Sequence, residues 1–262
     1  MNRIIIIRAT LAVFGLSACS SAPKPDTGPS TGTRAPASSA AAANAPPPSS
    51  MNTTGFDPAK LVEGTDSYQA FANGQALGTA TIALSREGAN YRYVTDLVVQ
   101  GGAMHQHTEG LFSAATLMPI SQTVKYSIQG TPLTTNITVA DGRATGRAQD
   151  PGPTGVVRTN VDLAVSPGTV DDQASAALIL TLPLADGYAK SFTSLATSPS
   201  EIRANTLMVQ GKETVTVPAG TFETYRVLVH SKEDATMYVT TTAPRRTVMV
   251  RVGNGVELRL VK

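Results

Sequence analysis

The chain has few of the residues on which catalysis and cross-linking most often depend. It contains no tryptophan, one cysteine and three histidines, and only 5% of its residues are aromatic. A single cysteine excludes an internal disulfide. The net charge is +2 and no basic block occurs, so we predict no nucleic-acid partner. Serine-hydrolase elbows, phosphate-binding glycine loops and zinc-protease motifs are all absent, so we expect no enzymatic activity and no cofactor.

The only long apolar run is at the N-terminus, in MNRIIIIRATLAVFGLSAC. It is too short for an ordinary membrane span and is typical of a secretory signal. Its last four residues, LSAC, resemble a bacterial lipobox, which predicts a lipoprotein signal peptide at 1–18 and acylation of Cys19. Lipidation would consume a thiol that is otherwise a liability in an exported protein. The alternative is a plain signal peptide that happens to end at a cysteine.

The residue after Cys19 is Ser20 rather than aspartate, which resembles the pattern of Gram-negative lipoproteins sent to the outer membrane. We therefore expect a protein of the bacterial cell envelope, lipid-anchored at the outer membrane and facing the periplasm. Residues 19–55 are rich in Pro, Ser, Gly and Thr and are predicted to be a disordered linker behind the anchor. The folded domain is predicted at 56–262, with no further membrane span.

Strand-like alternation dominates the folded part. In PISQTVKYSIQ, at 119–129, apolar and polar side chains alternate in the period of a half-buried β-strand. The segments at 90–99, 156–165 and 256–261 repeat this pattern, and glycine-rich turn signals separate them. The sequence therefore predicts a mainly β domain, either a single curved antiparallel sheet or a half-barrel, with one or two short helices.

One segment, VDDQASAALILTL at 170–182, is the candidate for a helix. Asp171 and Asp172 would complement the helix dipole at its start, and Pro183 would end it. We interpret the two carboxylates as helix capping, and the alternative is acid–base chemistry.

The stretch VTVPAGTFETYRV at 215–227 is either a catalytic loop or a turn. Pro218 fixes φ and Gly220 admits a positive φ, which favours a tight reversal between two strands. The Thr221 hydroxyl is the only group in that turn able to exchange a proton. The pattern therefore predicts a hairpin turn.

This stretch, extended to GKETVTVPAGTFETYRV, also resembles the hairpin signature of the DUF3108 family, exported bacterial proteins of unknown function. YQAFANGQALGTATIAL, TEGLFSAATLMPISQTV, DDQASAALILTLPLADG and NGVELRLV agree with the family in order, over about 66–262. The tryptophan that often opens the strand after the hairpin is missing, and Met237 and Tyr238 stand near its place. The resemblance implies a curved sheet like that of envelope lipoprotein carriers, with an apolar concave face partly closed by helix.

Two further clusters are candidates for binding. His105, His107 and Glu109 in HQHTE would share one strand face and offer two imidazoles and a carboxylate to a divalent metal. The alternative there is an ordinary polar strand face. Arg245 and Arg246 precede a strand and either meet lipid phosphates or are solvated charges beside a turn.

These observations predict a non-enzymatic envelope lipoprotein that binds an apolar or lipid-like ligand or acts as a scaffold, with the membrane and an envelope protein as possible partners. Two alternatives stay open: a metal-dependent hydrolase using His105, His107 and Glu109, and a structural adaptor that pairs through a sheet edge. A roomy apolar concavity would favour the ligand, and an exposed edge the adaptor. A concave face filled by the protein's own Tyr, Leu and Val side chains would contradict the ligand-binding prediction.

Overall fold

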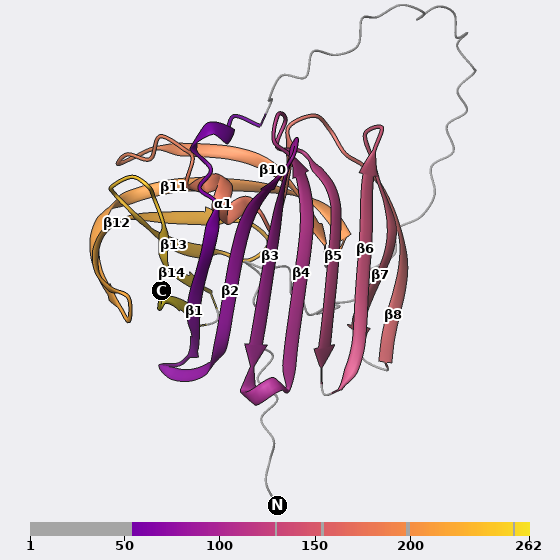
Figure 1. The fold of residues 1–262 in the computed structure, drawn as a ribbon, viewed down its shortest axis with the longest axis horizontal. Coiled ribbons are helices and arrows are strands. Elements are labelled where there is room, and N and C mark those ends of the chain that lie inside the picture. The colour runs from indigo at the N-terminus through magenta and orange to yellow at the C-terminus, as the bar shows by residue number, and fades with distance from the viewer. Residues whose placement is uncertain (1–53, 129, 153–154, 198–199, 254) are drawn as a thin grey trace, which may run out of the picture.

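The computed structural model describes residues 54–128, 130–152, 155–197, 200–253 and 255–262 (Figure 1). The predicted signal peptide at 1–18, the predicted acylation site Cys19 and nearly all of the linker predicted at 19–55 lie outside the described residues. The strands belong to one sheet, accompanied by one short helix and the 3₁₀ turns η2 and η3. The elements are η2 Pro58–Lys60, β1 Gly64–Ala72, β2 Gln75–Glu87, β3 Asn90–Val99, η3 Gln100–Gly102, β4 Met104–Ser113, β5 Pro119–Ile128, β6 Thr131–Ala140, β7 Arg143–Gly152, β8 Gly155–Ala164, β9 Thr169–Asp171, α1 Ser175–Ile179, β10 Ala189–Thr197, β11 Ser200–Val217, β12 Gly220–His230, β13 Ala235–Thr240, β14 Thr247–Val252 and β15 Val256–Leu260.

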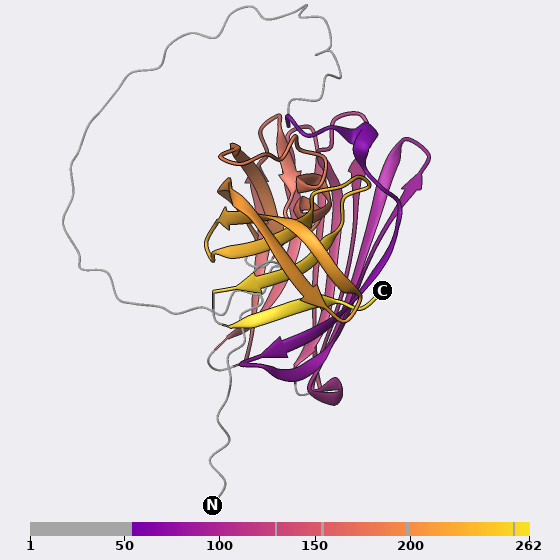
Figure 2. The same cartoon turned by 90° about the vertical axis from the view of Figure 1, so that its left-hand side faces the viewer.

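The sheet is a continuous, almost entirely antiparallel meander. Its order is β8-β7-β6-β5-β4-β3-β2-β1-β15-β14-β13-β12-β11-β10-β9, and only β9 and β10 run parallel. The pairing of β1 with β15 joins the first run of strands to the second. Figures 1 and 2 show these runs as two layers that cross, with α1 between them. The sheet stays open, with β8 and β9 at its edges, which confirms the predicted mainly β class with a curved sheet.

The alternation in the sequence sets which face of each strand is buried. On β3 every second residue from Tyr91 to Val99 is buried, and on β5 the buried positions include Gln122, Val124 and Tyr126. These faces meet the second layer, where β10 lies against β5. The concave interior is therefore filled by the protein's own side chains. The fully buried large ones are Phe112, Leu117, Ile137, Leu178, Ile179, Leu182, Leu195, Leu207, Met237, Tyr238 and Leu258.

The filled interior corrects one expectation. The family resemblance implied an apolar concave face open to a ligand, but the two layers close on each other and pack their apolar faces together. Among the described residues, a space of about 290 Å³ is found at the margin of this core, beside α1.

The helix is shorter than the sequence predicted, and its first residues are not helical. The segment expected at 170–182 contributes β9 at its start and only five residues, Ser175–Ile179, to α1. Asp171 pairs with β10 instead, and its Oδ1 accepts the backbone N–H groups of Gln173 and Ala174. The N-cap is Ala174, without a side-chain hydrogen bond, so neither aspartate caps the helix.

The Pro-Ala-Gly stretch lies in a hairpin between β11 and β12. Val217 and Gly220 are opposite each other, with Pro218 and Ala219 between them, and Gly220 has φ 137°. The Ala219 N–H donates to the Leu260 carbonyl at 3.1 Å, which ties this turn to β15. Within the described part of the chain, no helix is long and apolar enough to cross a membrane.

Candidate functional site

A cleft of about 290 Å³ opens beside α1, where the two layers part. Its walls come from segments far apart in the sequence: β1 and β2 on one side, β14 and β15 on another, and α1 with the residue that follows it. Apolar side chains form most of the wall, and the small Ala176 and Ala177 leave the space that larger residues would fill. The main lining residues are Tyr68, Ile82, Leu84, Ala176, Ala177, Leu180, Val250 and Leu258.

The mouth of the cleft carries the polar groups. Arg246 donates from Nη2 to Asp66 Oδ1 across it, and both side chains are partly exposed. The Tyr68 hydroxyl, inside the mouth, donates to the Thr247 carbonyl at 3.0 Å and lies 3.4 Å from Asp66 Oδ2. Burial raises the pKa of Tyr68 far above its usual value, with a further rise from Asp66, so this hydroxyl stays a neutral donor.

The two arginines singled out in the sequence hold the loop that forms this mouth. Arg245 donates to the carbonyl of Leu182, just beyond α1, and its guanidinium lies 5.8 Å from the centre of the Tyr225 ring. Arg246 has Asp66 as its partner. Both side chains therefore have partners in the protein, so they are more than solvated charges beside a turn.

A second groove of about 380 Å³ adjoins the cleft. It shares Val62, Leu180, Pro244 and Arg245 with the cleft and continues along η2, past Lys60. Together the two spaces form a path that is mostly apolar in the cleft and mixed in the groove, with both cationic and acidic side chains beside it.

A polar network joins the layers on the other side of α1. The Tyr93 hydroxyl of β3 donates to Asp171 Oδ1 of β9 at 3.0 Å. Gln122 of β5 donates to the Leu195 carbonyl of β10 at 3.1 Å and accepts from the Thr197 hydroxyl at 3.0 Å. These bonds connect the first run of strands to the second through buried groups.

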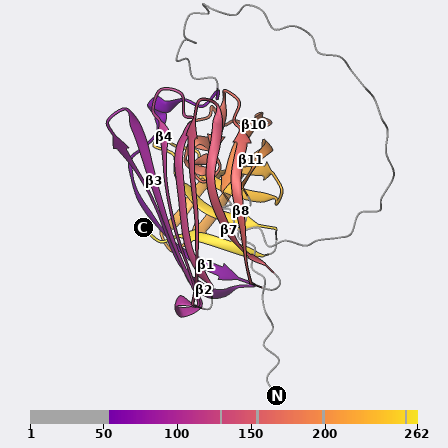
Figure 3. The ribbon, with the colours of Figure 1, turned by 90° about the vertical axis from the view of Figure 1, so that its right-hand side faces the viewer.

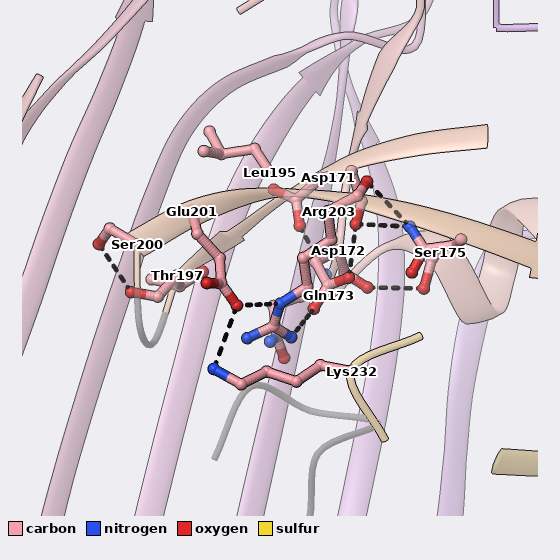
Figure 4. Close-up of polar contacts among 12 residues, drawn as sticks. Asp171, Asp172, Gln173, Ser175, Leu195, Thr197, Ser200, Glu201, Arg203 and Lys232 are labelled. Carbon is pink, nitrogen blue, oxygen red and sulfur yellow. Dashed lines mark hydrogen bonds and ion pairs between the residues drawn. The ribbon is translucent and has the colours of Figure 1, made fainter. Parts of the chain in front are cut away.

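The network extends along β10 and β11 (Figure 4). Asp172 accepts from the Ser194 hydroxyl at 2.7 Å and from Arg203 at 3.4 Å. Arg203 also bonds Glu201 at 2.8 Å, and Lys232 reaches the same carboxylate at 3.4 Å. The buried Arg203 cation thus lies between two carboxylates, which offsets the cost of burying it.

Burial dominates the electrostatics of the two aspartates. It raises the pKa of Asp171 to about 7, although nearby polar groups, led by Gln122 and Tyr93, oppose that rise. Burial also raises the pKa of Asp172, against the opposing charge of Arg203. Among the described residues, Thr169 Oγ1, Asp171 Oδ2 and both amide atoms of Gln173 are buried without a hydrogen-bond partner. Asp171 and Tyr93 are buried, and their hydrogen bond holds the layers together, whereas Asp172 borders a small space of about 40 Å³.

The residues predicted for metal binding share the outer face of β4, and each of them also contacts a residue of β3. His107 Nδ1 lies 2.8 Å from Asp96 Oδ1, and His105 Nε2 lies 3.6 Å from the same oxygen. Glu109 instead accepts from Arg92 at 2.9 Å, a hydrogen bond that lowers its pKa. Among the residues that the structure describes, no group of three or more His, Cys, Asp or Glu has the arrangement of a metal site. Both imidazoles therefore approach Asp96, and His107 Nε2 also lies 3.9 Å from Glu109 Oε2.

Sequence reasoning missed both the cleft and the network, although one signal was present. Gln122 lies on the otherwise apolar face of the β5 alternation, and a polar side chain there must find a buried partner. For the cleft, the sequence singled out Arg245 and Arg246 but not the apolar wall, whose residues come from five separate elements.

Comparison with known proteins places the fold in a family. A model of the family described as "Protein of unknown function (DUF3108)" matches residues 67–260. The chain belongs to the DUF3108 family. Among curated proteins none matches it.

Two solved structures resemble the DUF3108 domain at low sequence identity. A β-barrel-like DUF1849 protein from Brucella abortus is 14% identical and has a TM-score of 0.48, over 77% of this chain and 97% of that one. An exported Bacteroides fragilis protein with a YmcC-like fold is also 14% identical, with a TM-score of 0.26, over 79% of this chain and 97% of the other.

Proposed function

We propose that the protein binds the end of an apolar, lipid-like molecule in the cleft beside α1. The observation that carries this proposal is the mostly apolar wall around Ala176 and Ala177, which a few polar groups, among them Tyr68 and Arg246, also line. A ligand pocket is typically a mostly apolar cavity with a few polar groups that fix orientation. The main interior is filled, so the ligand binds at the margin of the core, not between the layers.

The size of the cleft limits the ligand. A volume of about 290 Å³ lies at the lower end of the range for small-molecule sites, which is roughly 300–1,000 Å³. We therefore expect a single hydrocarbon chain, or one end of it, with the remainder extending into the adjoining groove past Lys60.

The test uses the full chain carrying Cys19→Ala, which removes the predicted acylation site. Dodecanol is titrated into this protein and into the variant that adds Ala177→Phe, with binding followed by calorimetry. The added ring fills the cleft, so we expect affinity to fall at least tenfold, about 1.4 kcal/mol. The matched control is Ala204→Phe, the same change at an exposed position of β11. Equal binding by the Ala177→Phe variant and the control, with both folded, would overturn the proposal.

A further inference from the structure

The two edges of the sheet differ in length and exposure. β9 has three residues, all buried, so its edge is covered. β8 has ten residues and, among the described strands, pairs with β7 alone, and Val157 through Asn160 are all exposed. Figure 3 views the molecule from this side. An uncovered strand of this length is a template for pairing with another strand.

The hydrogen bonds between β7 and β8 determine which residues of β8 direct their backbone groups toward the open edge. The Val165 N–H donates to the Gly142 carbonyl at 2.8 Å, one step beyond the pair formed by Arg143 and Ala164. The register between β7 and β8 has no bulge, and hydrogen-bonded residues alternate along an antiparallel strand. Even-numbered residues of β8 therefore turn their N–H and C=O groups away from β7. They are Val156, Arg158, Asn160, Asp162 and Ala164.

The charges on this edge are self-complementary in one register. If β8 pairs antiparallel with β8 of a second copy around Asn160, each Arg158 lies opposite the other copy's Asp162. A shift that centres the pairing on residue 158 or on residue 162 places like charges opposite each other. Opposite charges across a strand pair are stabilising, and like charges are destabilising.

The apolar side chains agree with this register. Val157 is 49% exposed, a large value for a valine on the core-facing side of a sheet. Around Asn160 it would lie opposite Leu163 of the other copy, which is half-buried in the single chain. The same pairing would therefore cover the exposed Val157 and also satisfy the outward backbone groups.

We propose that two copies of the protein associate through antiparallel pairing of their β8 strands, centred on Asn160. The interface has two-fold symmetry, so the contact of Arg158 with Asp162 occurs twice. The two sheets join into one continuous sheet across the pair of molecules.

Charge reversal tests this arrangement. The parent protein is the full chain carrying Cys19→Ala. Analytical ultracentrifugation over a concentration series compares it with three variants that additionally carry Arg158→Asp, Asp162→Arg or both exchanges. We expect a dimer of the 27.2 kDa chain, a dissociation constant raised about 100-fold in each single variant, and recovery of the dimer in the double variant. The matched control is Arg226→Asp, on an exposed position of β12.

The variants differ in their risk to the fold. Asp162 forms an exposed ion pair with Arg143 inside the chain, whereas no ion pair is seen for Arg158 among the described residues, so Arg158→Asp is the cleaner change. Thermal melts verify that all variants fold. A parent protein that is monomeric at every concentration would overturn the proposal. So would single variants that dimerise like the control, or a double variant that does not recover.

Discussion

The two sides of α1 close the curved sheet in opposite ways. On one side, Tyr93 and Gln122 from the first layer bond directly to β9 and β10, and the space beside Asp172 measures about 40 Å³. On the other side, Ala176 and Ala177 face strands with apolar side chains, and a cleft remains. Directional hydrogen bonds fix the distance between the layers, whereas small apolar residues leave a space between them.

The two sides of α1 therefore differ in what their side chains can do: the polar side keeps the two layers together, and the apolar side leaves an open space. A buried polar group must keep its hydrogen-bond partner, because losing that hydrogen bond costs about 1–3 kcal/mol. The polar network therefore tolerates little change. An apolar wall has no such requirement, and it can exchange water for a hydrocarbon chain. The predictions below should therefore give large effects on stability in the polar network and small ones at the cleft.

The largest effect is expected from Asp171→Asn. An unfolded aspartate ionises near pH 3.8, but burial raises the pKa of Asp171 to about 7 in the folded state, which favours the neutral form. The stability of the parent protein therefore falls as the pH rises from about 4 to about 7, and the full loss is present above that. The asparagine variant stays neutral and should exceed the parent by roughly 3–4 kcal/mol at pH 8, with no difference near pH 4.

Urea unfolding of both proteins at a series of pH values measures this difference. Asp172 and every other titrating group are present in both chains, so the difference curve isolates position 171. The amide oxygen keeps the bonds from Tyr93 and the two backbone N–H groups, and the amide nitrogen occupies the place of Oδ2. Parallel stability curves would contradict the raised pKa of this carboxyl.

The next largest effect is expected from Gly110→Ala, below the same hydrogen bond. A Cβ at Gly110 would lie 2.4–2.5 Å from the ring carbons and hydroxyl of Tyr93. The ring is buried and bonded to Asp171, so it cannot move without breaking that bond. We expect a loss of about 2–3 kcal/mol, as for other overpacked cores.

The control for this change is Gly253→Ala, where the added methyl would meet only the Asp234 carbonyl oxygen at 3.7 Å. Chemical denaturation compares the two variants. If the Gly110→Ala variant were as stable as the Gly253→Ala variant, the Tyr93 ring would be able to move, contrary to the prediction.

Local patterns in the sequence predicted the strands and turns but not the contacts between layers. The alternation at 90–99 matches β3 residue for residue, because burial on one face needs only neighbouring strands. The helix at 170–182 was overestimated, since Asp171 pairs with β10, a strand that comes later in the chain. That pairing has no local signal.

The candidate site was predictable only in part. His105 and His107 do share a face, but the carboxylate that both of them approach is Asp96, which reaches them from β3 through strand register, while Glu109 lies near His107 alone. Arg245 and Arg246 were recognised as a pair near a turn, and their partners Leu182 and Asp66 lie far away in the sequence. Such partners are brought together by the order of the strands in the sheet, and a single sequence does not reveal that order.

The smallest effect is expected from Asp66→Asn at the mouth of the cleft. The ion pair with Arg246 is partly exposed, with side-chain exposures of 29% and 42%, and such pairs contribute about 0–1 kcal/mol. Denaturation should therefore show a loss below about 1 kcal/mol, and dodecanol affinity should change less than it does for Ala177→Phe. Lys212→Gln, which breaks the more exposed pair with Glu223, is the control and should be neutral. A loss for Asp66→Asn as large as that for Gly110→Ala would mean that the mouth of the cleft is as rigidly held as the polar network, and the contrast between the two sides of α1 would disappear.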